Sequence, residues 1–224
     1  MRSAERLRLL AALGCAALLA ACASGGDPGG NAREGNASTA AGASERSAPA
    51  GPPVSPEVQR AFDDASSALR SGRSEEAERA FRALAQAHPD LGGPHANLGL
   101  IQRRAGKLNE SVSELELAVR INPRQAIYWN QLGVSYRLAG QFGKAREAYE
   151  KSTALNPRYA APLLNLGILY DLYLGDGARA LDLYSRYLAL LPNGDPTVTK
   201  WVADLKNRKS AAPSPLVAAR KEKE

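Results

Sequence analysis

Glycine and proline recur through the middle of this 224-residue chain at a fixed spacing, which limits what the chain can fold into. Two series repeat every 34 residues, the glycines being Gly72, Gly106 and Gly140 and the prolines Pro89, Pro123 and Pro157. Gly175 and Pro192 continue the two series at a spacing of 35 residues. A period of this size is typical of a solenoid, in which each repeat is one supersecondary unit that packs against its neighbours.

The two series divide each unit into two arms of helical character. Each glycine lies 17 residues before a proline, and glycine is typical of the left-handed residue that ends a helix. Proline marks the exit from the second arm, because it cannot continue a helix. Bulky and small residues recur at helical spacings, in the third unit as Trp129, Leu132, Gly133 and Tyr136, then Ala145, Ala148, Tyr149 and Ser152. The sequence therefore predicts closely packed antiparallel helix pairs and an all-α solenoid.

The third unit also carries the motif of a known repeat family. The motif reads Trp129-x-x-Leu132-Gly133-x-x-Tyr136, then Gly140-x-Phe142-x-x-Ala145-x-x-x-Tyr149 and Asn156-Pro157. This pattern resembles the tetratricopeptide repeat (TPR). The resemblance covers about residues 58–192, is weaker at both ends, and implies an α-solenoid of about four TPR helix pairs over residues 56–192.

Two departures from the repeat pattern carry structural predictions. Asp64 occupies a place that leucine holds in the later units, so we expect the first helix to be terminal and to pack on one side only. The fourth unit has its extra residue between Gly167 and Gly175, which predicts an elongated or bulged turn there.

A further helix is predicted after the last repeat. The pair Asp195-Pro196 is typical of a helix start, with an N-cap acceptor followed by proline. One apolar stripe follows, made of Val198, Trp201, Val202 and Leu205. We therefore expect a capping helix within residues 193–209, closing the exposed face of the last repeat. Residues 210–224 are expected to form a disordered, basic tail.

The first 22 residues have the order of a secretory signal. Three arginines within the first eight residues form a basic start, and residues 9–21 form an uncharged, mostly apolar run too short to span a membrane. The run ends in Leu19-Ala20-Ala21-Cys22, which resembles the lipobox of bacterial lipoproteins. In that family the cysteine thiolate accepts a diacylglycerol, the signal is cut before it, and the new amino group is acylated. The resemblance implies a signal peptide at residues 1–21 and a covalent lipid, palmitate included, on Cys22.

Two other interpretations of this region stay open. Cys15 is a partial second match to the lipobox, but it leaves only six apolar residues after Arg8. The residues around Cys22 are also compatible with an ordinary cleavage site, which yields a freely secreted protein. In the lipoprotein interpretation, Ala23 in place of aspartate favours the outer membrane over the inner one.

Residues 22–55 are expected to be the lipidated cysteine and a flexible, disordered linker. Every aromatic residue of the chain lies between Phe62 and Trp201. The linker is rich in Gly, Ser and Ala, a composition that buries too little apolar area to offset the entropy of ordering it. A flexible chain of this length has its ends about 30 Å apart, so the linker tethers the repeats to the anchor.

The residue inventory argues against a catalytic site. Cys15 and Cys22 lie near the start of the chain, and His88 and His95 are the only histidines, both expected at the turn between two repeats. Zinc needs four suitable ligands, and a serine or cysteine nucleophile needs a neighbouring base. The net charge of +6 is made of mixed signs, which is weak support for nucleic acid binding. We expect no enzymatic activity, metal, nucleic-acid partner or small-molecule substrate, and no cofactor besides the lipid.

The TPR resemblance implies a concave groove, lined by the first helix of each pair, that holds an extended peptide or a partner helix. Aligning the repeats places these candidates in it: Asn97, Leu100, Arg103 and Arg104, then Asn130, Gln131, Val134 and Arg137, then Leu164, Asn165, Ile168 and Asp171. Amides pair with a peptide backbone and arginine with a carboxylate. The candidates for peptide contacts are therefore Asn97, Arg103, Asn130, Gln131, Arg137 and Asn165. An alternative role of such asparagines is to hold the helix pairs together.

The expected function is protein–protein binding by an exported scaffold that is lipid-anchored in the cell envelope, at the outer membrane and facing the periplasm. TPR clamps for chaperone C-termini are excluded, because the matching positions of this chain lack the clamp lysines. TPR lipoproteins that it resembles include those that escort the secretins of type IV or Tad pili, which implies help in assembling a pilus or secretion machine. The alternatives are an adaptor for cell-wall (peptidoglycan) enzymes and a freely secreted TPR binding protein.

Overall fold

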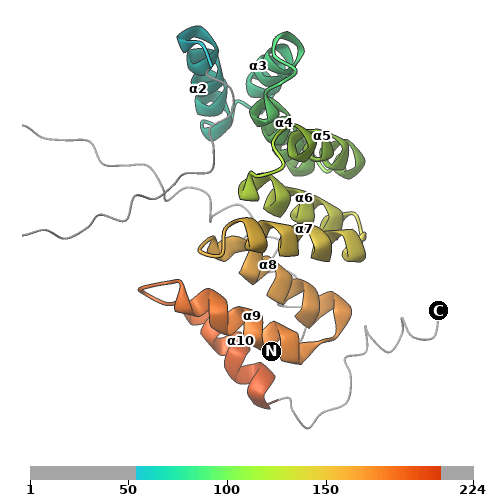
Figure 1. Ribbon diagram of the computed structural model, residues 1–224, viewed down its shortest axis with the longest axis vertical. Coiled ribbons are helices and arrows are strands. Elements are labelled where there is room, and N and C mark those ends of the chain that lie inside the picture. The colour runs from blue at the N-terminus through green and yellow to red at the C-terminus, as the bar shows by residue number, and fades with distance from the viewer. Residues whose placement is uncertain (1–53, 208–224) are drawn as a thin grey trace, which may run out of the picture. The chain divides into compact units, whose positions relative to one another are not determined.

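The structure, a computed structural model, describes residues 54–207, and every regular element within this range is helical (Figure 1). The elements are α2 (Pro56–Arg70), α3 (Ser74–Ala87), α4 (Gly92–Arg104), α5 (Leu108–Ile121), α6 (Ala126–Leu138), α7 (Phe142–Leu155), α8 (Ala160–Leu169), the π-helical turn η1 (Tyr170–Leu174), α9 (Gly177–Ala189) and α10 (Pro196–Asn207). None of these helices is long and apolar enough to cross a membrane. The predicted signal peptide, Cys22, most of the linker and the tail lie outside the described residues.

The helices pack as consecutive pairs, α2 with α3, α4 with α5, α6 with α7 and α8 with α9. The second helix of each pair also contacts the first helix of the next pair, so the pairs follow one another in chain order in Figure 1. α10 packs against α9 after the last pair. The predicted solenoid of four TPR helix pairs with a capping helix is confirmed over these residues.

The turn inside each helix pair depends on glycine. The four glycines of the series have φ angles between +71° and +78°, and they are Gly72, Gly106, Gly140 and Gly175. At the second turn, the N–H of Gly106 donates to the carbonyl of Arg103 at 3.1 Å, and the N–H of Lys107 donates to that of Gln102 at 2.9 Å. A residue with a Cβ is strained in this left-handed conformation. The repeated glycine therefore reports the end of each first helix.

A second set of glycines lets the two helices of a pair approach each other closely. Gly133 in α6 faces the ring of Tyr149 in α7, and a Cβ on Gly133 would lie 2.6 Å from that ring. The same distance of 2.6 Å recurs in the neighbouring pairs, for Gly99 with Leu115 and for Gly167 with Tyr184. These bulky partners are fully buried, so in these three pairs a large side chain of the second helix packs directly on a glycine of the first.

The two departures from the repeat pattern take the predicted forms. Asp64 is exposed on α2, whereas the leucines at the aligned positions, Leu98, Leu132 and Leu166, are 2%, 2% and 5% exposed. The extra residue of the fourth pair is absorbed by η1, which continues α8 and ends at the left-handed Gly175. The N–H of Asp176 donates to the carbonyl of Tyr170 at 2.9 Å and closes this wide turn.

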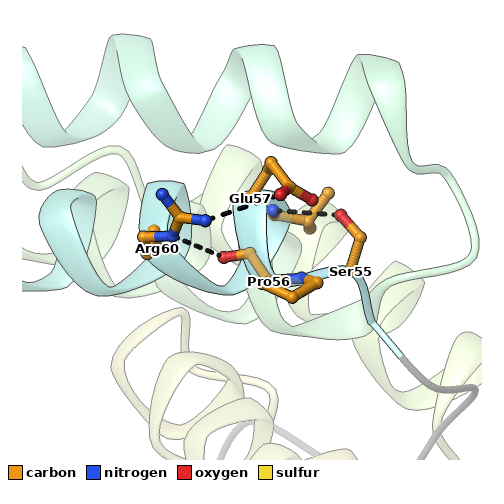
Figure 2. A network of polar contacts seen from close by, with 5 residues as sticks. Ser55, Pro56, Glu57 and Arg60 are labelled. Carbon is orange, nitrogen blue, oxygen red and sulfur yellow. Dashed lines mark hydrogen bonds and ion pairs between the residues drawn. The ribbon is translucent and has the colours of Figure 1, made fainter.

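The first helix begins with a small network of polar contacts (Figure 2). Ser55 Oγ accepts a hydrogen bond from the N–H of Val58 at 3.4 Å, the N-cap arrangement. Arg60 donates to the carbonyl of Pro56 at 3.2 Å and lies 3.5 Å from the carboxylate of Glu57. The pKa of the Glu57 carboxylate is held below its usual value by hydrogen bonds, first from the backbone N–H of Glu57 itself and then from the Ser55 hydroxyl.

The capping helix α10 begins with a carboxylate cap. Asp195 Oδ1 accepts hydrogen bonds from the N–H groups of Thr197 at 2.9 Å and Val198 at 3.1 Å. Val198, Trp201 and Leu205 are 1%, 7% and 8% exposed, so the predicted apolar stripe is the buried face of this helix. The rings of Trp201 and Tyr184 have their centres 5.6 Å apart, which continues the core of the fourth pair into α10.

Candidate functional site

The predicted groove residues lie on the first helices of three successive pairs. α4 contacts α6 and α6 contacts α8, so these first helices form one continuous face, which we call the first-helix face. All the candidates lie on these helices except Asp171, which lies in η1 directly after α8. The structure therefore brings the candidates together, while their predicted contacts with a partner stay a prediction.

Arg103 connects α4 to α6 through its guanidinium group. One of its nitrogens donates to the backbone carbonyl of Gln131 at 3.0 Å and to Ser135 Oγ at 3.3 Å, and the other donates to Gln131 Oε1 at 2.5 Å. Ser135 Oγ also lies 2.8 Å from Ser111 Oγ, and the Ser111 hydroxyl donates to the carbonyl of Gly99 at 2.7 Å. Both serines are fully buried. This chain of hydrogen bonds joins the second helix pair to the third.

Two asparagines make the corresponding connection between α6 and α8. The amide nitrogen of Asn165 donates to Asn130 Oδ1 at 3.0 Å, and the amide nitrogen of Asn130 donates to the Tyr159 hydroxyl at 3.1 Å. Asn130 is only 3% exposed. Burial raises the pKa of the Tyr159 hydroxyl, so this hydroxyl stays neutral at physiological pH. Both amides therefore hold neighbouring repeats together, as the alternative role of the asparagines requires.

Arg137 belongs to an aromatic cluster at the end of α6. Its Nε donates to the Tyr149 hydroxyl at 3.3 Å, and its guanidinium carbon lies 5.8 Å from the centre of the Tyr173 ring. Phe142 packs on the same ring, with the two ring centres 4.8 Å apart. Asn97 has a local role, because its amide donates to the carbonyl of Gly93 at 3.0 Å within α4. Each of the six polar candidates thus has a hydrogen-bond partner inside the protein.

The most exposed large apolar side chains of the first-helix face lie on its central helix. Ile127 and Leu138 are at the two ends of α6, and each is 48% exposed. Together with the half-buried Val134 they recur at i, i+7 and i+11, so they share one side of the helix. We call these three residues the α6 stripe. Ile127 and Leu138 are absent from the candidates predicted by sequence, although their spacing by 11 residues already places them on one side of a helix.

The two histidines lie at or near helix ends of the fold. His88 directly follows α3, as predicted, but the prediction is wrong for His95, which lies in the first turn of α4. His95 Nδ1 is 2.7 Å from Glu114 Oε2, so the pair joins α4 to α5. Within residues 54–207 no group of three or more His, Cys, Asp or Glu side chains is arranged to hold a metal ion.

Family models agree with this architecture. Two models, both described as tetratricopeptide repeat, match residues 62–126 and 126–159. The second match begins at the first residue of α6 and ends at the residue before α8, so it covers one complete helix pair. No protein with a curated description matches the chain in sequence.

Several solved structures have the same fold. MamA from Desulfovibrio magneticus RS-1, from residue 41 to its end, is 17% identical, with a TM-score of 0.61 over 75% of this chain and 91% of that chain. PilF from Pseudomonas aeruginosa is 20% identical, with a TM-score of 0.62 over 68% of each chain. A thermophilic TPR protein of Thermus thermophilus is 22% identical, with a TM-score of 0.56 over 68% of this chain and 83% of that chain. At these identities the likeness concerns the fold alone.

Proposed function

We propose that this chain, a tetratricopeptide-repeat protein, is a scaffold whose partner protein binds along the first-helix face. Protein–protein interaction is the function that a TPR fold supports. The observation that carries the more specific proposal is the α6 stripe, because large apolar side chains are exposed at the centre of this face. Exposed apolar side chains that share one surface are typical of interaction sites.

The energetics of the α6 stripe suit such a role. Full burial of an exposed isoleucine or leucine contributes about 1.5–3 kcal/mol, so each half-exposed side chain has about 1 kcal/mol left to gain from a partner. The polar residues beside the stripe already bond to one another across the repeats. A partner therefore meets a preformed surface, and little ordering entropy is lost when it binds.

We further propose that this scaffold works at the cell envelope, anchored by lipid on Cys22, and assists the assembly of a pilus or secretion machine. The support for the anchor is the sequence Leu19-Ala20-Ala21-Cys22 behind a basic and then an apolar segment. Residues 23–55 have the composition of a flexible linker, which gives the repeats reach from the membrane surface. The proposed activity is binding and requires no catalytic group.

The partner is tested by crosslinking in native envelopes, followed by mass spectrometry of the captured proteins. The test variant is Ile127→Glu with Leu138→Glu, and the matched control is Leu174→Glu, which changes a 36%-exposed leucine in η1. We expect a secretin or pilus subunit with the unaltered chain and the control, and at least about a tenfold loss with the double variant, which corresponds to about 1.4 kcal/mol. Equal capture by all three proteins contradicts the binding face, and capture of cell-wall enzymes contradicts the role in pilus assembly.

The anchor is tested separately with Cys22→Ser. Serine lacks the thiolate that accepts the lipid, so we expect an uncleaved precursor or a soluble product in membrane fractionation. A serine variant that is still cleaved and still carries lipid contradicts the lipoprotein assignment.

A further inference from the structure

A cavity of about 720 Å³ opens between the second helices of the last two pairs, lined by residues of α7, α8, η1 and α9. Its buried lining residues are Leu166, Tyr170 and Leu183, which are 5–6% exposed. The exposed lining residues include two small ones, Ala154 in α7 and Ala178 in α9. The volume lies within the range of pockets that bind ligands, and the lining is apolar at its base.

Charged side chains of both signs surround this apolar base. Glu150 and Asp182 supply negative charge, and Arg179 and Arg186 supply positive charge. Each of these charges pairs with a residue three or four positions away along the chain. Arg179 lies 3.3 Å from Asp176, Arg186 lies 3.4 Å from Asp182, and Glu150 lies 3.8 Å from Arg146, and all these side chains are more than one-third exposed. Such exposed pairs contribute little, so these charges are available to a segment that carries both signs itself.

The small side chain at position 154 is particular to this repeat junction. One repeat earlier the aligned position holds Arg120 in place of alanine. The aligned tyrosines also differ, because the Tyr136 hydroxyl donates to Glu116 at 2.5 Å, whereas the Tyr170 hydroxyl accepts from Arg179 at 3.2 Å. The lining of the α7–α9 cavity therefore differs from the aligned residues of the preceding repeat junction.

The chain leaves the described fold close to this cavity. α10 ends at Asn207, and Leu205 Cδ2 lies 3.3 Å from the position of a Cβ on Gly177, the first residue of α9. The next two residues of α9, Ala178 and Arg179, line the cavity. The lining residues of α9 reach to Arg186, about 12 Å along the helix. Nine residues of extended chain reach about 30 Å, so a segment that begins at residue 208 reaches the whole cavity.

The segment that leaves here contains one apolar pair. Leu216 and Val217 are the only apolar residues larger than alanine or proline within residues 208–224. They follow Pro215, and after two alanines they precede a stretch of mixed charge, residues 220–224, with the sequence RKEKE. The order of a short apolar pair and then charges of both signs matches an apolar cavity with a rim of both signs.

We propose that Leu216 and Val217 bind in the α7–α9 cavity of the same chain, with residues 220–224 against its charged rim. This contact is separate from the first-helix face and independent of the proposed function. A tethered segment has an effective concentration in the millimolar range. A weak contact with a dissociation constant of about 0.1 mM then gives about a tenfold excess of bound over unbound segment.

Hydrogen exchange of the full chain in detergent tests the contact. The variant Leu216→Ser with Val217→Ser removes the apolar pair, and Ala211→Ser with Ala212→Ser is the matched control in the same segment. Peptides that cover residues 150–157 and 178–186 are expected to exchange about tenfold faster in the first variant than in the unaltered chain or the control.

A change on the cavity side gives an independent readout. Ala154→Arg places on α7 the residue that the preceding repeat has at the aligned position, so the helix tolerates it. Because a long, charged side chain at this lining position competes with the apolar pair for the cavity, trypsin is expected to cleave after Arg220 about tenfold faster than in the unaltered chain. Equal exchange and equal cleavage in all the proteins overturn the proposal. Protection that grows with protein concentration also overturns it, because the contact is then made between chains.

Discussion

At the scale of single residues, glycine has two separate roles, and only one of them concerns the backbone. Gly72, Gly106 and Gly140 take a left-handed conformation at the turns, with nothing within 4 Å of a Cβ placed there. Gly133 is helical, and its role is to leave room for the ring of Tyr149. The first role was predictable from the 34-residue spacing, and the second from the alternation of small and bulky residues.

Replacing Gly133 by alanine tests the close helix contact. The new methyl group would lie 2.6 Å from the fully buried Tyr149 ring, so the ring or one of the two helices must shift. We expect a loss of about 1–3 kcal/mol of unfolding free energy, measured by chemical denaturation. Gly143→Ala is the control, because Gly143 is also helical but has nothing within 4 Å of its Cβ position. That variant should lose nothing and gain up to about 1 kcal/mol, and equal losses in both variants would contradict this packing.

Arg103 is the residue whose role changed most between sequence and structure. The repeat alignment made it a candidate for binding a carboxylate, but its guanidinium group bonds to Gln131, 28 residues later in the chain. The direction of a long side chain depends on which neighbours are packed around it, and those neighbours come from another repeat. Side-chain orientation of this kind could not be predicted from spacing within one repeat.

Arg103→Ala is therefore expected to destabilise the fold. Hydrogen bonds to a charged group contribute about 1.5–3 kcal/mol, and the variant also leaves the buried Ser135 hydroxyl without this donor. The neighbouring Arg104 is exposed, so Arg104→Ala should change the unfolding free energy by less than about 0.5 kcal/mol. Chemical denaturation curves measure the unfolding free energy of both variants. If Arg103→Ala is as stable as the unaltered chain, Arg103 is again a candidate for binding a partner.

At the scale of helices, several element ends follow from local chemistry, among them the glycine turns and the side-chain caps of α2, α9 and α10. The glycine turns and the prolines after the second helices could be read from the sequence, and so could the start of α10 at Asp195-Pro196. The position of the extra residue of the fourth pair and the bulged turn that it makes were also evident, but the π-helical geometry of this turn was not. A π-helical turn keeps Tyr170 in the core at 6% exposure, and it depends on packing against α9, which spacing alone does not describe.

Removing the cap of α10 tests how firmly this helix closes the solenoid. Asp195→Ala loses two hydrogen bonds from the first turn and the one from the Tyr187 hydroxyl, so we expect a loss of at least about 1 kcal/mol and a Tm lower by at least about 2–4 °C. Asp195→Asn keeps an acceptor oxygen and should retain most of the stability. Circular dichroism melting curves measure both, and identical melting of the alanine variant and the unaltered chain would mean that the cap is not needed.

At the scale of the whole molecule, half-buried and buried tyrosines make the stability of the fold depend on pH. Burial, and then the hydrogen bond to Asp195, raises the pKa of Tyr187 to about 12. Burial also raises the pKa values of four other tyrosines, Tyr128, Tyr136, Tyr149 and Tyr159. An ordinary tyrosine in an unfolded chain has a pKa of about 10. The folded state therefore holds these protons more tightly than the unfolded state does.

This difference predicts alkaline unfolding. Because the folded pKa of Tyr187 is raised, its contribution to stability is complete below about pH 10 and is lost as the pH rises to about 12. Urea denaturation midpoints at intervals between pH 9 and 12 should fall steadily, and Tyr187→Phe should make the fall shallower. A midpoint that is constant over this range, or a phenylalanine variant with the same slope, contradicts the assigned environment of Tyr187.

The most direct test of the proposed binding role is photocrosslinking in native envelopes from single positions on the two helices of the third pair. A photoreactive side chain is placed in turn at Ile127, Val134 and Leu138 on α6, and at the exposed Lys151 on α7 as the control. A partner that binds the first-helix face crosslinks from the three α6 positions and not from Lys151. Crosslinks from Lys151 with none from α6 would show that the partner binds elsewhere, and the assigned role of the α6 stripe would then be wrong.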